Sequence, residues 1–221
     1  ELGDLVSTSD QDRKKLEVMN LVAAYQALPR FLNRSFMMSD LLALHKTVLA
    51  EISVEAGHLR SEDSAIFNAA GVAVYLPPAH GQIRPLLREL VSYINKTDHP
   101  APVAAGVSHI WFEKIHPFLD GNGRVGRLLS AYILTKGGYD FSGLVPFEQY
   151  LDEHRDDYYY FLGHDRQDVT EFVEFYLTAQ LTQAKVSLKA AHEAGKPDQY
   201  AHLLPRRGEI MRMIGDHKMV S

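Results

Sequence analysis

The sequence predicts a mostly α-helical domain with one short β-hairpin, and three observations support this fold class. Apolar residues recur every three or four positions in several separate stretches, which is the spacing of one helix face. One stretch, G-V-A-V-Y-L-P-P at residues 71–78, is instead rich in β-branched and aromatic residues and stops at two prolines. Hydrophobic residues make up 46% of the chain and charged residues 23%, which is typical of a soluble globular protein.

The first third of the chain predicts two helices and the hairpin. A helix is expected from residue 13 to residue 28, because Pro29 cannot continue it. Ser39 can cap a second helix, which Gly57 closes. Its inner face would carry Leu42, His45, Val48, Leu49 and Ile52. Residues 57–82 are expected to form a small hairpin or flap.

The remainder of the chain predicts further helices separated by short breaks. Apolar periodicity predicts helices from about residue 85, over 102–115, over 124–136 and over 168–194, with one or two short helices in 147–162. Gly137 and Gly138 end one of these helices, and Gly195 and Pro197 end another. We therefore expect a lead-in over residues 1–14, one domain over 15–195, and a linker with the first helix of a truncated module over 196–221.

Composition excludes several classes of protein. The formal net charge of −5 argues against attraction of the whole surface to nucleic acid or anionic lipid, although a local basic pocket stays open. The absence of cysteine excludes disulfides, thiolate catalysis and cysteine-ligated zinc, and it suits a reducing compartment. No window is apolar enough for a membrane helix, and no secretory signal precedes the first domain. We expect a cytoplasmic protein whose N-terminus lies upstream of Glu1.

The stretch I-H-P-F-L-D-G-N-G-R-V-G-R-L-L, residues 115–129, concentrates chemistry in a glycine-rich loop before a helix. Successive backbone N–H groups at Gly121, Asn122 and Gly123 can converge into an anion-binding nest, and the helix adds its positive dipole end. Arg124 and Arg127 are three residues apart, so both can reach one face of the first turn and contact phosphate oxygens. This loop predicts a site for a phosphate-containing ligand.

Two further side chains of the same loop suggest a reaction. Asp120 would repel an anion unless a divalent metal bridges it to phosphate, and Mg²⁺ prefers few carboxylates plus phosphate and water. His116 can take a proton from a hydroxyl nucleophile near neutral pH. Taken singly, each feature is more often a turn, a helix end or a solvated face. Taken together, they predict attack of a hydroxyl on a nucleotide phosphate.

The string H-P-F-L-D-G-N-G-R-V-G-R resembles the Fic (filamentation induced by cAMP) signature, H-x-F-x-[DE]-G-N-G-R-x-x-R, at every specified position. The segments A-G-H-L-R at 56–60, V-Y-L-P-P, and Y-L-D-E-H-R-D-D-Y-Y-Y-F-L at 150–162 also resemble Fic domains. The resemblance covers roughly residues 15–195. It implies a Fic-type helical bundle with a β-hairpin flap and transfer of AMP from ATP to a Ser, Thr or Tyr hydroxyl of a target protein.

The resemblance also implies a role for each motif residue. His116 would deprotonate the target hydroxyl, and Asp120 would hold Mg²⁺ on the phosphates. The anion hole for the α-phosphate would comprise Gly121, Asn122 and Gly123. The outer phosphates would contact Arg124 and Arg127.

Three further roles follow from the resemblance. Phe118 would anchor the loop in the core. Tyr159, or its neighbour Tyr158, would line the adenine pocket. The flap, about Val72 to Pro78, would hold the target segment as an added strand. Self-modification is a further expectation, and the oligomeric state, including a homodimer, stays open.

Alternatives remain at this point. A Fic transferase could use UMP, phosphate or phosphocholine as the transferred group. A different class is a nucleotide-sensing regulator that binds DNA through a missing C-terminal module, for which the basic run P-R-R-G-E-I-M-R is the support. Other histidines, namely His45, His58 and His109, are expected to be core or surface residues rather than ligands, since nothing has the spacing of a zinc site.

Inhibition in many Fic proteins uses a helix with the motif [S/T]-x-x-x-E-[G/N], whose glutamate pairs with the second motif arginine. Thr47–Glu51 and Thr170–Glu174 have the Thr–Glu spacing, but Ile52 and Phe175 follow them. The inhibitory segment is therefore expected either on a separate protein or upstream of Glu1. We favour the upstream position, and we expect Arg127 to be unpaired in this chain.

Overall fold

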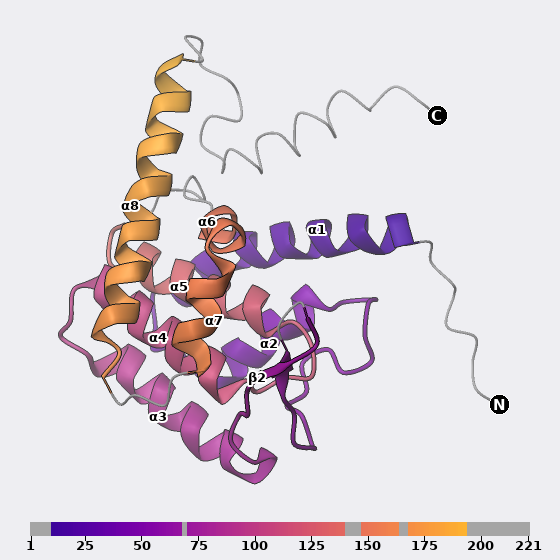
Figure 1. Ribbon diagram of the computed structural model, residues 1–221. Coiled ribbons are helices and arrows are strands. Elements are labelled where there is room, and N and C mark those ends of the chain that lie inside the picture. Colours follow the sequence, from indigo (N-terminus) through magenta and orange to yellow (C-terminus); the bar gives the residue numbers. More distant parts are fainter. Residues whose placement is uncertain (1–9, 68–69, 140–146, 164–167, 194–221) are drawn as a thin grey trace, which may run out of the picture.

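The computed structural model describes residues 10–67, 70–139, 147–163 and 168–193, and it confirms the mostly helical fold with one hairpin (Figure 1). The longer elements in chain order are α1 (Asp10–Ala27), α2 (Met38–Val48), β1 (Ile66–Phe67), β2 (Ala73–Tyr75), α3 (Ile83–Lys96), α4 (Ala101–Ile115), α5 (Asn122–Lys136), α6 (Phe147–Glu153), α7 (Arg155–Gly163) and α8 (Thr170–Glu193). Short 3₁₀ turns, η1 (Leu28–Phe31) and η2 (His80–Gln82), precede α2 and α3.

Helices α4 and α5 form the centre of the fold and pack extensively against each other. Helices α3 and α8 cover α4, and α1 and α2 cover α5. The N-terminal part of α1 and the far end of α8 extend away from the core (Figure 1). Phe112 of α4 and Leu128, Leu129 and Tyr132 of α5 have no exposed surface. Because the loop 116–121 joins these two helices directly, the buried centre of the fold positions it.

The predicted hairpin is confirmed as two antiparallel strands. Ile66 of β1 pairs with Tyr75 of β2, and the register shifts between Ile66 and Phe67. Strand β2 packs against α7, where the carbonyl of Val74 lies so close to Gly163 that an added Cβ would approach it to 2.8 Å. The flap is therefore attached to the helical body through α7.

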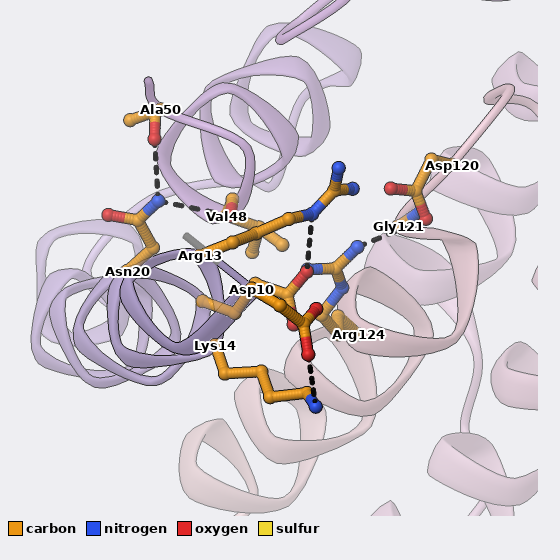
Figure 2. A network of polar contacts seen from close by, with 10 residues as sticks. Asp10, Arg13, Lys14, Asn20, Val48, Ala50, Asp120, Gly121 and Arg124 are labelled. Carbon is orange, nitrogen blue, oxygen red and sulfur yellow. Dashed lines mark hydrogen bonds and ion pairs between the residues drawn. The ribbon is translucent and has the colours of Figure 1, made fainter. Parts of the chain in front are cut away.

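The prediction of one helix from Ser39 to Gly57 is wrong at both ends. Met37 caps α2, and the carboxylate of Asp40 accepts the N–H of Met37 at 2.8 Å. The helix ends at Val48, where Asn20 of α1 donates to the carbonyl of Val48 at 3.3 Å and to that of Ala50, just beyond the helix, at 2.7 Å (Figure 2). The Val48 carbonyl is among those that a helix end leaves unpaired.

The predicted N-terminal lead-in is too long, because α1 already begins at Asp10. The predicted linker and additional module, residues 196–221, lie outside the described residues. Among the described helices, none combines the length and apolar character needed to cross a membrane.

Candidate active site

The loop after α4 starts with a backbone conformation that residues other than glycine seldom adopt. His116 caps the C-terminus of α4 with φ 46° and ψ 62°, in the left-handed region. Its N–H donates to the carbonyl of Phe112 at 3.0 Å, so the chain turns sharply while the helix end stays hydrogen-bonded. Phe118, two residues on, is fully buried, as expected of an anchor.

Asn122 closes the loop from the first turn of α5. Its side-chain amide donates to the carbonyl of Phe118 at 2.8 Å and accepts the N–H of Phe118 at 3.0 Å. The Asn122 side chain is only 3% exposed. The side chain of Asn122 therefore shapes the loop. The predicted contact of Asn122 with an anion would be made by its backbone N–H.

His45 of α2 supports the same loop from the other side. Its Nδ1 accepts the N–H of Gly57 at 2.9 Å, which places the ring proton on Nε2. Nε2 then donates to the carbonyl of Asp120 at 3.0 Å, and the ring stacks on Phe118 at 3.6 Å. Burial lowers the pKa of His45, although the Asp120 carbonyl opposes this. His45 is a core residue, as predicted, but its contact with the loop was not predicted.

The imidazole of His116 is held in its neutral form. Burial is the main cause that lowers its pKa to about 4, the Arg60 charge adds to this, and the backbone of Glu113 opposes it. A base must be unprotonated before it can accept a proton. At neutral pH, His116 is therefore ready to accept one.

Asp120 and Arg124 form an ion pair at the mouth of the loop. Asp120 Oδ1 accepts the N–H of Gly121 at 2.6 Å and lies 3.0 Å from Nη2 of Arg124. The Asp120 side chain is half exposed, at 53%. On its other side Arg124 faces α1, near Arg13 (Figure 2). Glu17 of α1 lies 3.8 Å from Nη1 of Arg124 and 3.5 Å from Nε of Arg13.

The expectation that Arg127 is unpaired is wrong. Its Nε lies 2.7 Å from Oε1 of Glu148, in the first turn of α6. Burial alone would lower the pKa of Arg127, and the carboxylates of Glu148 and Glu113 more than offset it. Both motif arginines thus face carboxylates, which an incoming phosphate would have to replace.

A buried polar cluster lies beneath Arg127, on the inner side of α4. Tyr158 directs its hydroxyl to Nε2 of His109 at 3.2 Å. Burial lowers the pKa of His109 to about 3 and raises that of Glu113 to about 7, although the Arg127 charge opposes the second shift. His109 is a core residue, as predicted, because Phe172 stacks parallel to its ring.

The structure brings most of the predicted site residues together at the junction of α4 and α5. His116 ends one helix, Asp120 and Gly121 lie in the loop, and residues 122–127 begin the next helix. Tyr159 lies on α7, half-buried, with its ring 6.3 Å from that of Tyr158. Sequence reasoning missed His45, Glu148 and Arg60, whose contacts with the loop residues cross 21 to 75 positions.

Comparisons with known proteins agree with this arrangement. Residues 35–134 match the model of the Fic/DOC family. The chain is 27% identical over 220 residues to the protein adenylyltransferase Fic of Drosophila mojavensis, covering 93% of this chain and 41% of that protein. It is 29% identical over 210 residues to the Drosophila yakuba protein of the same name, covering 90% of this chain and 39% of that protein. The chain thus spans less than half the length of these relatives.

Solved structures show the same fold. A Fic family protein from Desulfovibrio desulfuricans G20 superposes with a TM-score of 0.71 at 32% identity, covering 81% of this chain and 55% of that one. The Fic-1 fragment of C. elegans superposes with a TM-score of 0.62 at 23% identity, covering 86% and 55% of the two chains, and supports the fold alone. The chain is therefore similar to Fic/DOC proteins, and the matched residues 35–134 include the signature at the junction of α4 and α5.

Proposed function

We propose that this domain is a protein adenylyltransferase, which transfers AMP from ATP to a Ser, Thr or Tyr hydroxyl of a target protein. The observation that carries the proposal is the position of His116, at the left-handed end of α4 and just before a glycine nest at the start of α5. A base next to an anion site is what hydroxyl attack on a phosphate requires. The names of the matched Drosophila proteins support the same activity.

The reaction moves one proton and exchanges one bond. The target hydroxyl oxygen bonds to the α-phosphorus of ATP while His116 accepts the hydroxyl proton. The bond between the α-phosphorus and the oxygen bridging to the β-phosphate breaks, and pyrophosphate leaves. In-line attack needs little covalent chemistry from the protein, so positioning and charge stabilisation supply most of the acceleration.

The glycine nest would bind the α-phosphate. The N–H groups of Gly121, Asn122 and Gly123 precede or open α5, whose dipole favours an anion there. Gly121 has φ 81°, which suits glycine, and a Cβ at this position would come within 3.4 Å of the His45 ring. A larger residue would therefore disturb both the turn and its support.

The arginines would bind the outer phosphates after exchanging partners. Arg124 would leave Asp120 and Glu17, and Arg127 would leave Glu148. Guanidinium groups bind phosphate in a two-pronged geometry, so each exchange replaces one charge-assisted contact with another. Tyr159 of α7 would line the adenine pocket.

Asp120 fits a Mg²⁺ ion that phosphate oxygens largely hold. Its carboxylate is half exposed beside the nest, and the described residues contain no cluster of three or more His, Asp or Glu that could hold a metal on its own. A lone carboxylate completed by phosphate and water is typical of Mg²⁺. When bound, the ion would neutralise negative charge on the phosphates. Asp120 would release the N–H of Gly121 and turn toward the nucleotide.

The target protein would bind along the flap, about Val72 to Pro78. Strand β2 belongs to a sheet of two strands in the described part of the chain, and an extended peptide can add to such a sheet through backbone hydrogen bonds. Val72 and Leu76 expose 59% and 73% of their surfaces beside this strand. The flap would thus select extended segments more than particular sequences.

Labelled nucleotides test this function. The chain is incubated with Mg²⁺, a cell lysate as a source of acceptors, and ATP labelled on either the α- or the γ-phosphate. Relative to the same lysate without the chain, adenylyl transfer predicts additional covalent α-label and no additional γ-label on protein. Additional γ-label would instead show phosphoryl transfer. Tight ATP binding without attached label would favour the nucleotide-sensing alternative.

A further inference from the structure

Arg60 follows the turn at Gly57 and precedes the flap, and its side chain has no exposed surface. A buried guanidinium loses its hydration, so it needs several well-placed hydrogen-bond acceptors. Burial indeed lowers the pKa of Arg60. The nearest carboxylate, that of Asp63, is 3.9 Å away and two-thirds exposed, so it compensates little of this cost.

Backbone carbonyls are the main partners of this charge. Nε donates to the carbonyl of His116 at 2.8 Å, and Nη1 donates to that of Glu62 at 2.8 Å. Nη2 donates to the carbonyl of Pro78. The N–H of Arg60 itself donates to the carbonyl of Pro117 at 2.9 Å. One residue therefore contacts the loop 116–121 at two consecutive positions and the chain on either side of the hairpin, at Glu62 before β1 and at Pro78 after β2.

The contact with His116 falls on the residue whose backbone is strained. A left-handed conformation costs about 1 kcal/mol or more for a residue other than glycine, and it persists when its surroundings hold it. In this left-handed conformation the carbonyl of His116 accepts the hydrogen bond from Arg60. Arg60 thus stabilises the turn that directs the imidazole.

We propose that Arg60 is a positioning residue, which locks the flap and the His116 loop into one unit so that a hydroxyl presented by the flap meets the imidazole. This role rests on the proposed adenylyl transfer. The glycine nest, which would bind the phosphate, has supports other than Arg60, namely Asn122 and His45. Loss of the Arg60 contacts should therefore impair transfer much more than nucleotide binding.

The test compares Arg60→Lys with Asn95→Ala. Lysine keeps the positive charge, but a single ammonium group cannot reproduce the planar fork that reaches three carbonyls. Asn95 is a control with three hydrogen bonds of its own, to both backbone groups of Phe36 and to the carbonyl of Val91. These contacts join α3 to the segment before α2, away from the flap.

Arg60→Lys should bind ATP within about twofold of the wild-type affinity in calorimetry, and its rate of AMP transfer to lysate proteins should fall by about tenfold or more. Asn95→Ala should lower thermal stability and leave the transfer rate per folded molecule unchanged. A wild-type transfer rate in Arg60→Lys would overturn the proposal. So would a parallel loss of ATP affinity and transfer, because that would show a general loss of structure.

Amide hydrogen exchange tests the coupling without relying on activity. In the wild-type chain, the amides of β2 and of the His116 loop should open with the same free energy, because one side chain holds both. Arg60→Lys should accelerate exchange at both places, and Asn95→Ala at neither. Widely different opening free energies in the wild type would overturn the role of Arg60, even if Arg60→Lys failed to fold. Coupled exchange in a chain that transfers no AMP would overturn the proposed function alone.

Discussion

The middle and the C-cap of α4 each carry a histidine, one buried (His109) and one half-buried (His116), and the pKa values of the two rings shift in the same direction although their positions differ. Burial is the main cause that lowers the pKa of His109 to about 3 and that of His116 to about 4. Both rings are therefore neutral at physiological pH. Neither the residue type nor the direction of the pKa shift distinguishes a base from a core residue here.

Backbone position and neighbours separate the two. His109 lies inside the helix, with Tyr158 and Ser130 within 3.2 and 3.4 Å of its two ring nitrogens. His116 lies at the left-handed helix end, four residues before Asp120, and Arg60 holds its carbonyl. A buried, fully surrounded imidazole contributes to packing, whereas the same ring at a helix end beside an anion site can serve a reaction.

The largest effect is expected from His116→Ala. Transfer of AMP should fall by about 10²-fold or more, because removal of a general base affects the chemical step. ATP affinity should stay close to that of the wild type, since the imidazole faces the incoming hydroxyl. Label transfer and calorimetry together check this prediction. A variant that keeps the wild-type rate would remove His116 as the base.

His109→Ala should affect stability instead of chemistry. The change removes a ring that packs against Phe172 and leaves the Tyr158 hydroxyl without its partner. Such losses typically cost about 2–4 kcal/mol. Chemical denaturation measures this cost, and the transfer rate per folded molecule should be unchanged. A stable variant with impaired transfer would contradict the contrast between the two rings.

Glu113→Gln tests the buried cluster around His109 through the pH dependence of folding stability. Burial raises the pKa of Glu113 to about 7, above the ordinary value of 4.5, so the folded state favours the protonated form. The stability that protonated Glu113 contributes to the folded state is fully present below about pH 4.5 and is lost as the pH rises through about 7. Linkage gives a loss of about 2 kcal/mol between pH 5.5 and 8. The two histidines, whose lowered pKa values raise stability over the same range, contribute equally to both proteins. Denaturation at the two pH values should therefore show a change in stability that is about 2 kcal/mol less favourable in the wild type than in the variant.

The smallest effect is expected from Glu148→Gln, which weakens the partner of Arg127. If Arg127 binds outer phosphates, the affinity for ATP should rise by roughly threefold, as for a partly exposed ion pair. The affinity for AMP, which lacks those phosphates, should not change. Calorimetry with both nucleotides checks this, and an equal change for both would place Arg127 elsewhere in the site.

The sequence predicted the site residues that lie in one continuous motif. It did not predict the contacts between residues that are distant in the chain. The motif from His116 to Arg127 could be interpreted directly, because one loop and one helix turn carry it. The three supporting contacts join residues distant in sequence: His45 to Asp120, Arg60 to His116 and Glu148 to Arg127. Apolar periodicity also overestimated α2, whose end is capped by a side chain from α1, Asn20. Local patterns contain no signal for such tertiary contacts.

The most direct test of the account measures AMP transfer by the wild type, His116→Ala and His109→Ala side by side, each at the same concentration of folded protein. Mass spectrometry would locate AMP on acceptor hydroxyls. The account predicts equal yields for the wild type and His109→Ala and about one hundredth of that yield for His116→Ala. Equal losses in the two variants, or none in His116→Ala, would contradict the claim that the end of α4 makes its histidine a base.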